Sequence, residues 1–223
     1  FEFHSINSTA YDNRNSPTTG KYWLIKTFEV LKGIQNDVVL DGTVYLDETY
    51  FTKVRSKLVT KDGKKLRGIS RNKIGVGVAC NETKSIFIVT GTSKPSRKST
   101  KETYSQHIAR GSVLVHDDEH SHSILIEELE LESIVYPTAE TKELSDKDNP
   151  LYPVNNLHLL LKQFIRNHGA YDREHLQDWL NLFWFIMNEP KDKYDKVLKF
   201  IEMAVLSPKK VRYRDAMSSK HSK

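Results

Sequence analysis

The chain reads TVYLDETYF from residue 43 to residue 51, and these β-branched and aromatic side chains predict a β-strand. One carboxylate, Asp47, interrupts the apolar part of the run. A carboxylate inside a strand is costly to bury unless it has a partner or a metal ion. Strand residues alternate between faces, so Asp47 and Glu48 are expected on opposite sides of a sheet. Asp47 is therefore a candidate functional residue; the alternative is an exposed strand face or a turn.

A second acidic position follows the apolar run GSVLVH at residues 111–116. Asp117 comes directly after this expected strand, and the carboxyl ends of strands are where sites form in α/β proteins. Asp118 and Glu119 compete for the same role. One of the three acids can instead cap a helix expected to begin near Ser121. The sequence favours Asp117 over its neighbours only narrowly.

The third segment reads YPVNNLHLLLK at residues 152–162, and Pro153 suits the first turn of a helix. A helix turns 100° per residue, so Asn155 and Lys162 lie nearly on one stripe. Asn155 offers an amide oxygen, and Lys162 a point charge for a phosphate. The alternatives are a helix cap and a solvated lysine. The opposite stripe, expected to pack on a sheet, comprises Leu157, Leu160, Leu161 and Phe164.

Outward from these segments, strands are expected at 43–51, 73–80, 85–91, 112–116 and 133–136. Helices are expected at about 21–32, 101–110, 122–131, 154–168, 173–187 and 192–206, with loops at 1–20 and 138–149. Three consecutive strands followed by alternating helices and strands predict an α/β protein with a mixed sheet flanked by helices. With acids on the first and fourth strands, this order resembles the ribonuclease H-like fold.

Composition narrows the class of protein. The chain has 223 residues, of which 38% are hydrophobic, as in an ordinary globular protein. No apolar run approaches the ~20 residues that cross a bilayer, so a membrane partner is not expected. The single cysteine, Cys80, excludes an internal disulfide and a cysteine zinc site. A cytoplasmic location is the resulting expectation. Four histidines near these segments suggest a zinc site: His116, His120, His122 and His158. Because no cysteine or tight acidic set supports it, they are instead interpreted as structural or DNA-contacting, with His158 as a hydrogen-bonding neighbour of Asn155.

The formal charge is +5, from 34 basic and 29 acidic residues. Between Lys53 and Lys73 there are nine basic residues and one acid, and further basic clusters occur at 94–101 and 209–214. Such clusters form phosphate-contacting surfaces, although a solvated hairpin or tail is the plain alternative. The predicted DNA-binding residues are Lys53, Arg55, Lys57, Lys64, Lys65, Arg67, Arg71 and Lys73, together with Lys162.

These features fit phosphodiester cleavage. Two divalent ions ~3.5–4 Å apart can activate a nucleophile and neutralise the attacked phosphate. Magnesium prefers hard oxygen ligands and keeps several waters. Asp47, Asp117 and Asn155 are the predicted metal ligands, and with Lys162 they form the predicted catalytic set.

The quoted segments resemble the catalytic domain of bacterial insertion-sequence transposases of the ISXO-like kind (the insertion sequence 1595 group). Residues 44–51 resemble that family's xDETxF opening, residues 111–117 its second acidic strand, and residues 148–162 its helical segment. The likeness covers roughly residues 20–190. The spacings, 70 residues from Asp47 to Asp117 and 38 from there to Asn155, are like the Asp-Asp-Glu pattern. Asparagine at the third position with a lysine seven later is similar to the Asp-Asp-Asn-Lys subgroup.

This resemblance implies a ribonuclease H-like core, Mg²⁺ or Mn²⁺ dependence, and cleavage of transposon ends followed by their joining to target DNA. It also implies a homo-oligomer on DNA, associated with the nucleoid. Residues 1–40 would be a remnant of an N-terminal DNA-binding region, 41–190 the catalytic domain, and 191–223 a C-terminal helix and basic tail. Because the family's zinc ribbon is missing, the alternative is a truncated or decayed transposase that binds DNA without cutting it. A nuclease of the same fold is a further alternative.

Overall fold

The computed structural model describes residues 4–52, 59–60, 62–64, 66, 68–145, 147–168, 173–188 and 190–218. The chain divides into two compact units. One comprises residues 35–160 and contains the β-sheet, and we call it the sheet unit. The other combines residues 1–34 with 161–223, and we call it the helical unit because its described elements are helices.

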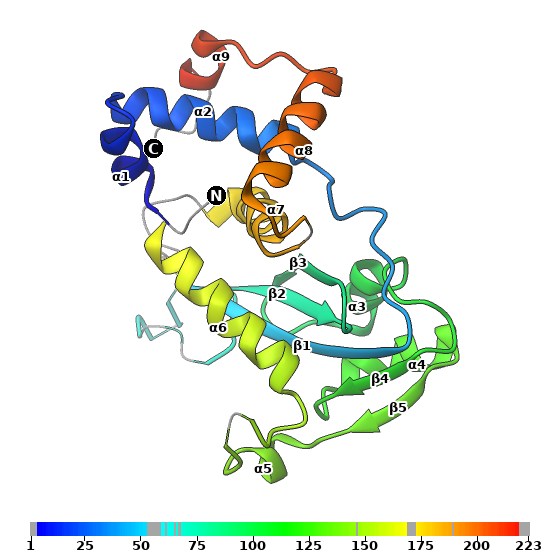
Figure 1. Cartoon of the computed structure of the whole chain (residues 1–223). Coiled ribbons are helices and arrows are strands. Elements are labelled where there is room, and N and C mark those ends of the chain that lie inside the picture. The colour runs from blue at the N-terminus through cyan, green and yellow to red at the C-terminus, as the bar shows by residue number, and fades with distance from the viewer. Residues whose placement is uncertain are drawn as a thin grey trace. The chain divides into compact units, whose positions relative to one another are not determined.

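The sheet has five strands in the order β3-β2-β1-β4-β5 (Figure 1). β1 pairs antiparallel with β2, which pairs antiparallel with β3, whereas β4 lies parallel to both β1 and β5. This order, with only β2 reversed, is that of the ribonuclease H-like fold, so the predicted α/β mixed sheet is confirmed. The strands are β1 Thr43–Thr52, β2 Lys73–Cys80, β3 Ser85–Thr92, β4 Val113–His116 and β5 Glu132–Val135.

Helices cover both faces of the sheet. In Figure 1, α3 (Arg97–Tyr104) and α4 (Ser123–Leu129) lie behind the strands, while the first part of α6 (Tyr152–Asn167) crosses in front of them. The short helices η1 (His120–His122) and α5 (Thr138–Thr141) belong to the connections. The core on the α3–α4 side contains Leu40, Val44, Leu46, Ala79, Ile86, Tyr104, Ile108, Leu114, Leu125 and Leu131.

The alternation of side chains along β1 is as predicted. Val44 and Leu46 enter the core, and the Glu48 carboxylate accepts a hydrogen bond from Tyr104 Oη of α3 at 2.9 Å. Asp47, between Leu46 and Glu48, therefore faces the opposite side, where α6 lies. The two neighbouring acids of β1 thus have different surroundings.

The helical unit joins both ends of the chain. The Phe28 ring stands edge-on to the Trp179 ring with centroids 5.0 Å apart, and the Tyr22 hydroxyl donates to the Val211 carbonyl at 3.1 Å. Lys209 pairs with Glu29 at 2.8 Å, so distant parts of the sequence share one core. Besides the end of α6, the unit's helices are α1 Ile6–Asp12, α2 Pro17–Val30, η2 Arg173–His175, α7 Leu176–Met187, α8 Lys193–Leu206 and α9 Tyr213–Ser218.

Two helix predictions were wrong in position. Residues 1–20, expected as loop, contain α1 and the start of α2, because Ser5 and Ser16 each accept a backbone N–H bond as N-caps. The helix expected at 101–110 begins earlier, where Ser96 and Ser99 form a capping box. Serine-rich stretches read as loops can therefore be helix starts.

The other elements follow the predictions closely. All five strands lie within one or two residues of their predicted bounds. α5 falls in the expected 138–149 loop, and α9 was not predicted. In the described ranges, no helix is both long enough and apolar enough to traverse a bilayer.

Candidate metal centre

The sheet register brings the two predicted aspartates together. β1 and β4 run parallel with Leu46 opposite His116, so the next residues in each strand direction, Asp47 and Asp117, are lateral neighbours. Neighbouring strands lie about 4.8 Å apart. Asp117 lies just beyond the last paired residue of β4. Its charge raises the pKa of Asp47, and its Oδ1 lies 3.9 Å from His122 Nδ1, so the Asp117 carboxylate borders both faces at this end of the sheet. Two carboxylates that are 70 residues apart in sequence are thereby placed side by side.

The electrostatics of this pair are unfavourable in the absence of a cation. Burial raises the pKa of Asp47 to about 7, with further contributions from the charges of Asp117 and Glu48. The Glu48 backbone N–H donates to Asp47 Oδ1 at 2.7 Å and opposes this rise. Burial likewise raises the pKa of Asp117, although its Oδ1 accepts a bond from the Glu119 N–H at 3.1 Å. A bound cation would stabilise the ionised form of both groups.

α6 supplies the neighbouring groups on this face. His158 is buried, and its Nδ1 lies 3.7 Å from Asp47 Oδ2. The expected neighbour of His158 was Asn155, whereas the contact shown is with Asp47. Asn155 is half-buried one helical turn earlier, and its side chain makes no hydrogen bond to any residue that the structure describes. Within the described part of the chain, its amide oxygen is thus available as a ligand.

Lys162 lies two turns beyond Asn155 on α6 and is exposed. It falls in the helical unit, whereas the aspartates and Asn155 fall in the sheet unit. Of the α6 stripe predicted to pack inward, Leu161 and Phe164 are buried, but Leu157 and Leu160 are only half-buried. The buried stripe of α6 instead includes Val154 and His158. The His158 imidazole therefore lies next to Asp47 of β1.

The two aspartates and Asn155 together form a set of oxygen donors. Two carboxylates and an amide carbonyl are hard oxygen ligands of the kind that magnesium and manganese prefer. The pKa values of both aspartates are raised, which indicates that the protein's own positive charges and hydrogen-bond donors do not fully stabilise the two negative charges. The residues present therefore fit a hard divalent cation.

A buried polar cluster on the other face of the sheet was missed. The His122 ring is fully buried, with Nε2 3.3 Å from each Glu48 oxygen and Nδ1 3.1 Å from His116 Nδ1. Burial lowers the pKa of His122. The hydrogen bond to Glu48 and the charges of the surrounding carboxylates together raise it by more, so the net shift of this pKa is upward. Burial and the neighbouring His122 lower the pKa of His116 to about 4. The available signal was Glu48 itself, a carboxylate on the core-facing side of a strand.

The predicted DNA-binding residues are only partly described. Lys64 and Arg71 are exposed, and Lys73 is half-buried with its Nζ donating to Thr52 Oγ1 at 2.7 Å. The rest of that set lies outside the described residues: Lys53, Arg55, Lys57, Lys65 and Arg67. The basic cluster at 94–101 is paired with acids, because each of its cations lies within 4.0 Å of a glutamate. That cluster therefore presents little uncompensated charge.

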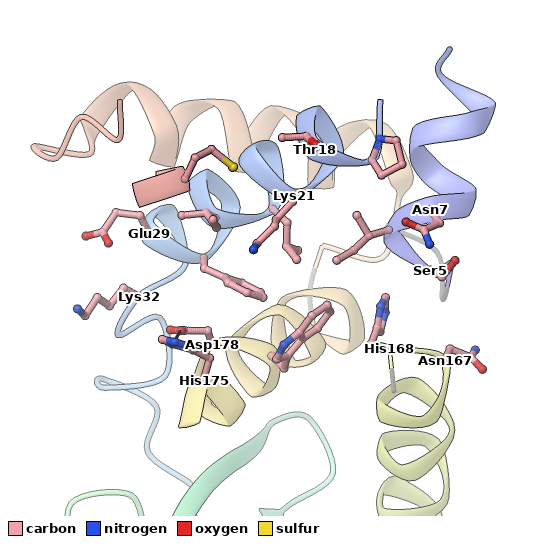
Figure 2. Close-up of a pocket in the computed structure, with 17 residues that line it drawn as sticks. Ser5, Asn7, Thr18, Lys21, Glu29, Lys32, Asn167, His168, His175 and Asp178 are labelled. Atoms are coloured by element: carbon pink, nitrogen blue, oxygen red, sulfur yellow. Dashed lines mark ion pairs between the residues drawn. The ribbon is translucent and has the colours of Figure 1, made fainter. Parts of the chain in front are cut away.

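A separate cavity of about 760 Å³ lies within the helical unit (Figure 2). His168 and Trp179 stack at one side of it, with ring centroids 4.3 Å apart, and His175 Nδ1 lies 3.4 Å from Asp178 Oδ2 at another. Burial lowers the pKa of His168 to about 4. None of the predicted metal ligands lines this cavity.

Comparison with known proteins gave structural matches only. No protein-family model and no curated protein matches the chain. The catalytic domain of Mos1 mariner transposase matches with a TM-score of 0.42 at 13% identity, covering 83% of this chain and 90% of that one. A pre-cleavage Mos1 transpososome matches with a TM-score of 0.37 at 11% identity, covering 93% and 75%.

A simian T-cell lymphotropic virus intasome in complex with PP2A regulatory subunit B56 gamma matches with a TM-score of 0.42 at 8% identity. That match covers 69% of this chain, and the chain spans half the length of the one it matches. The fold assignment here rests on the strand order and not on these likenesses. Function is accordingly argued from the side chains.

Proposed function

We propose that the chain is a metal-dependent DNA transposase, of the ISXO-like insertion-sequence kind with an Asp-Asp-Asn-Lys set. It cleaves transposon ends and joins them to target DNA. The observation that carries this proposal is the lateral pairing of Asp47 and Asp117, with the pKa of Asp47 raised to about 7. A ribonuclease H-like sheet with paired carboxylates at this position is suited to phosphodiester chemistry.

Asp47, Asp117 and Asn155 are the residues that would hold Mg²⁺ or Mn²⁺. The ions would supply charge neutralisation at the attacked phosphate and an activated oxygen nucleophile. His158 lies beside the Asp47 carboxylate, with its Nδ1 3.7 Å from Oδ2, where a small movement would let it orient that group. The Glu48 N–H fixes the other oxygen of that carboxylate at 2.7 Å. The protein's part is thus to hold two carboxylates rigidly where their mutual repulsion favours a cation.

The reaction has two displacements at phosphorus. In the first, water attacks the phosphodiester at a transposon end, the P–O3′ bond breaks, and a free 3′-OH remains. In the second, that hydroxyl attacks a target phosphodiester, and the target's own 3′ oxygen leaves. Lys162 and the basic stretch ending at Lys73 contact backbone phosphates, and two copies of the chain hold two ends.

The experiment is DNA cleavage and joining by the whole chain with labelled ends, with and without Mg²⁺. We expect Asp47→Ala to lower the rate on the order of 1000-fold, about 4 kcal/mol of transition-state stabilisation, while DNA binding persists. Asp118→Ala is the matched control, because Asp118 is exposed and adjacent to the site. Cleavage at the wild-type rate in the Asp47 variant would rule out the mechanism.

A second candidate is a non-catalytic DNA-binding module. It is favoured by one specific observation, namely that Asn155 stands where a carboxylate would bind a cation more tightly. This candidate predicts DNA affinity that falls steeply with salt and no nicking with either Mg²⁺ or Mn²⁺. The same cleavage assay therefore separates the two functions.

A further inference from the structure

The buried cluster on the α3–α4 face has the arrangement of a second metal site. It is formed by His116 at the end of β4, His122 at the end of η1, and Asp117 between them. One donor atom from each residue can be chosen so that all three lie within 4.8 Å of one another. His122 Nδ1 lies 3.1 Å from His116 Nδ1 and 3.9 Å from Asp117 Oδ1.

These distances suit a single tetrahedral ion. Zinc binds imidazole nitrogen at about 2.0–2.1 Å, which places two nitrogens on one ion roughly 3.3 Å apart. The two Nδ1 atoms are already at that separation within a few tenths of an ångström. The Asp117 carboxylate has to approach, because its Oδ1 lies 3.9 Å from His122 Nδ1. It is the half-buried member of the set, with a side chain 27% exposed.

The outer nitrogens of both rings are held by other groups. His122 Nε2 lies 3.3 Å from both Glu48 oxygens, and His116 Nε2 lies 3.0 Å from Ser133 Oγ of β5. Glu48 is fixed in turn by the Tyr104 hydroxyl at 2.9 Å. Metal-ligating histidines typically donate their other N–H to a carboxylate or similar acceptor, which orients the ring and increases its basicity.

These outward hydrogen bonds determine what the two inner nitrogens, His116 Nδ1 and His122 Nδ1, present to each other. If each Nε2–H donates outward, both Nδ1 atoms direct lone pairs at each other across 3.1 Å. Such lone pairs repel unless a proton or a cation lies between them. The nearby Asp117 carboxylate, itself lacking full compensation, favours the doubly charged cation.

We propose that His116 Nδ1, His122 Nδ1 and Asp117 bind one divalent transition-metal ion of the zinc class. Two nitrogen donors select zinc or cobalt over magnesium, which prefers oxygen alone. The fourth position is open on the exposed side of Asp117 and takes water. The bound ion ties β4 to η1 and fixes the Asp117 backbone at the edge of the catalytic face. This site shares Asp117 with the proposed catalytic set, but the evidence for it is the separate geometry of the two imidazole rings.

The test is a Co²⁺ titration of the whole chain, stripped of metal by a chelator and followed by visible absorption. We expect an intense tetrahedral spectrum that saturates at one ion per chain, is removed by Zn²⁺ and is unaffected by excess Mg²⁺. His122→Asn and His116→Asn each abolish it. His120→Asn, at an exposed histidine two residues from His122, leaves it unchanged.

Two further measurements cover the case in which the histidine variants do not fold. Glu48→Gln keeps a hydrogen-bonding partner for His122 and should weaken Co²⁺ affinity about 10- to 100-fold, as loss of an outer carboxylate does. X-ray absorption of the zinc-loaded wild type should show two imidazole ligands, and a shell of oxygen atoms alone would overturn the proposal. So would a wild-type protein with no cobalt spectrum, since the rings would then share only a proton.

Asp47→Ala separates this inference from the proposed function. The variant should retain the cobalt spectrum, because Asp47 is not one of the three proposed ligands, while it loses DNA cleavage. Retained cleavage with a normal spectrum contradicts the transposase mechanism alone. Loss of the spectrum in this variant, with the fold intact, contradicts the metal site proposed here.

Discussion

At the scale of residues, Asp47 and Glu48 show how one strand serves two purposes. They are adjacent in sequence, but alternation sends Asp47 toward α6 and Glu48 into the core against Tyr104 and His122. The first is paired with Asp117 and poorly compensated; the second is held by two hydrogen-bond donors. The same side-chain chemistry thus yields a candidate ligand on one face and a structural anchor on the other.

Replacing Asp47 by asparagine should stabilise the metal-free protein at alkaline pH. The folded pKa of Asp47 is about 7 against 3.8 for the free residue, so the folded state binds its proton more tightly. Wild-type stability therefore falls as pH rises from about 4 to about 7 and stays low above that. The neutral Asp47→Asn lacks this loss and should gain about 2–4 kcal/mol at pH 8. Urea unfolding with a chelator present measures the difference.

The gain should shrink as the pH falls and vanish near pH 4, where both side chains are neutral. Adding Mg²⁺ should stabilise the wild type and not the variant. Asp118→Asn, at the exposed neighbouring acid, is the control and should change stability little at any pH. A variant that is less stable than the wild type at pH 8 contradicts the assigned environment of Asp47.

The candidate ligands could be found from sequence because each follows a local pattern. Asp47 interrupts a strand-forming run and Asp117 ends one, and both features are visible within ten residues. The partners of Glu48 could not be found in this way. Tyr104 and His122 are 56 and 74 residues away, and only the packing of α3 and η1 against the sheet brings them to it.

At the scale of elements, the packing of α3 on β2 requires a glycine at position 77. Gly77 pairs with Glu48 across the strands, and the Tyr104 hydroxyl occupies the space where a side chain would be. A Cβ added at Gly77 would lie 2.0 Å from Tyr104 Oη and 2.6 Å from its Cζ. The glycine therefore allows α3 to reach Glu48 across the strand.

Gly77→Ala should accordingly destabilise the sheet unit by about 2–3 kcal/mol, because a buried ring must move or the strands must separate. Displacement of Tyr104 should also loosen Glu48 and, through it, His122. Thermal unfolding followed by circular dichroism measures the loss, with Glu82→Ala in the exposed β2–β3 turn as the control. Equal melting temperatures for the two variants would contradict this packing.

The strands were more predictable than the helices, for a physical reason. Strand patterns in this chain are short apolar runs bounded by turns, and those bounds are local. Helix starts depend on capping serines, and Ser5, Ser16 and Ser96 look like loop residues until their hydrogen bonds are known. The strand order itself followed from the order of elements together with the family resemblance, not from periodicity.

At the scale of the whole molecule, the chain folds as two units with separate reporters. All three tryptophans, Trp23, Trp179 and Trp184, belong to the helical unit, and the single cysteine, Cys80, is buried in β2 of the sheet unit. Burial raises the pKa of the Cys80 thiol to about 12, so it reacts only when the sheet opens. Each unit therefore carries its own reporter group.

Phe28→Ala should lower the stability of the helical unit by about 2–4 kcal/mol, because it removes the ring that packs edge-on against Trp179. Tryptophan fluorescence should report this loss at lower urea, whereas the urea dependence of Cys80 labelling should be nearly unchanged. Lys32→Ala, at an exposed residue just after α2, is the control for effects of the helix surface. Equal shifts in both signals would mean that the two units unfold as one.

The central claim is that Asp47 and Asp117 together bind a divalent cation. The most direct measurement is anomalous diffraction from crystals of the whole chain soaked in Mn²⁺. The account predicts a manganese peak bounded by the carboxylates of Asp47 and Asp117 on the α6 face of the sheet, absent from crystals of Asp47→Asn. Density for both carboxylates with no manganese between them, in crystals that bind manganese elsewhere, would contradict it.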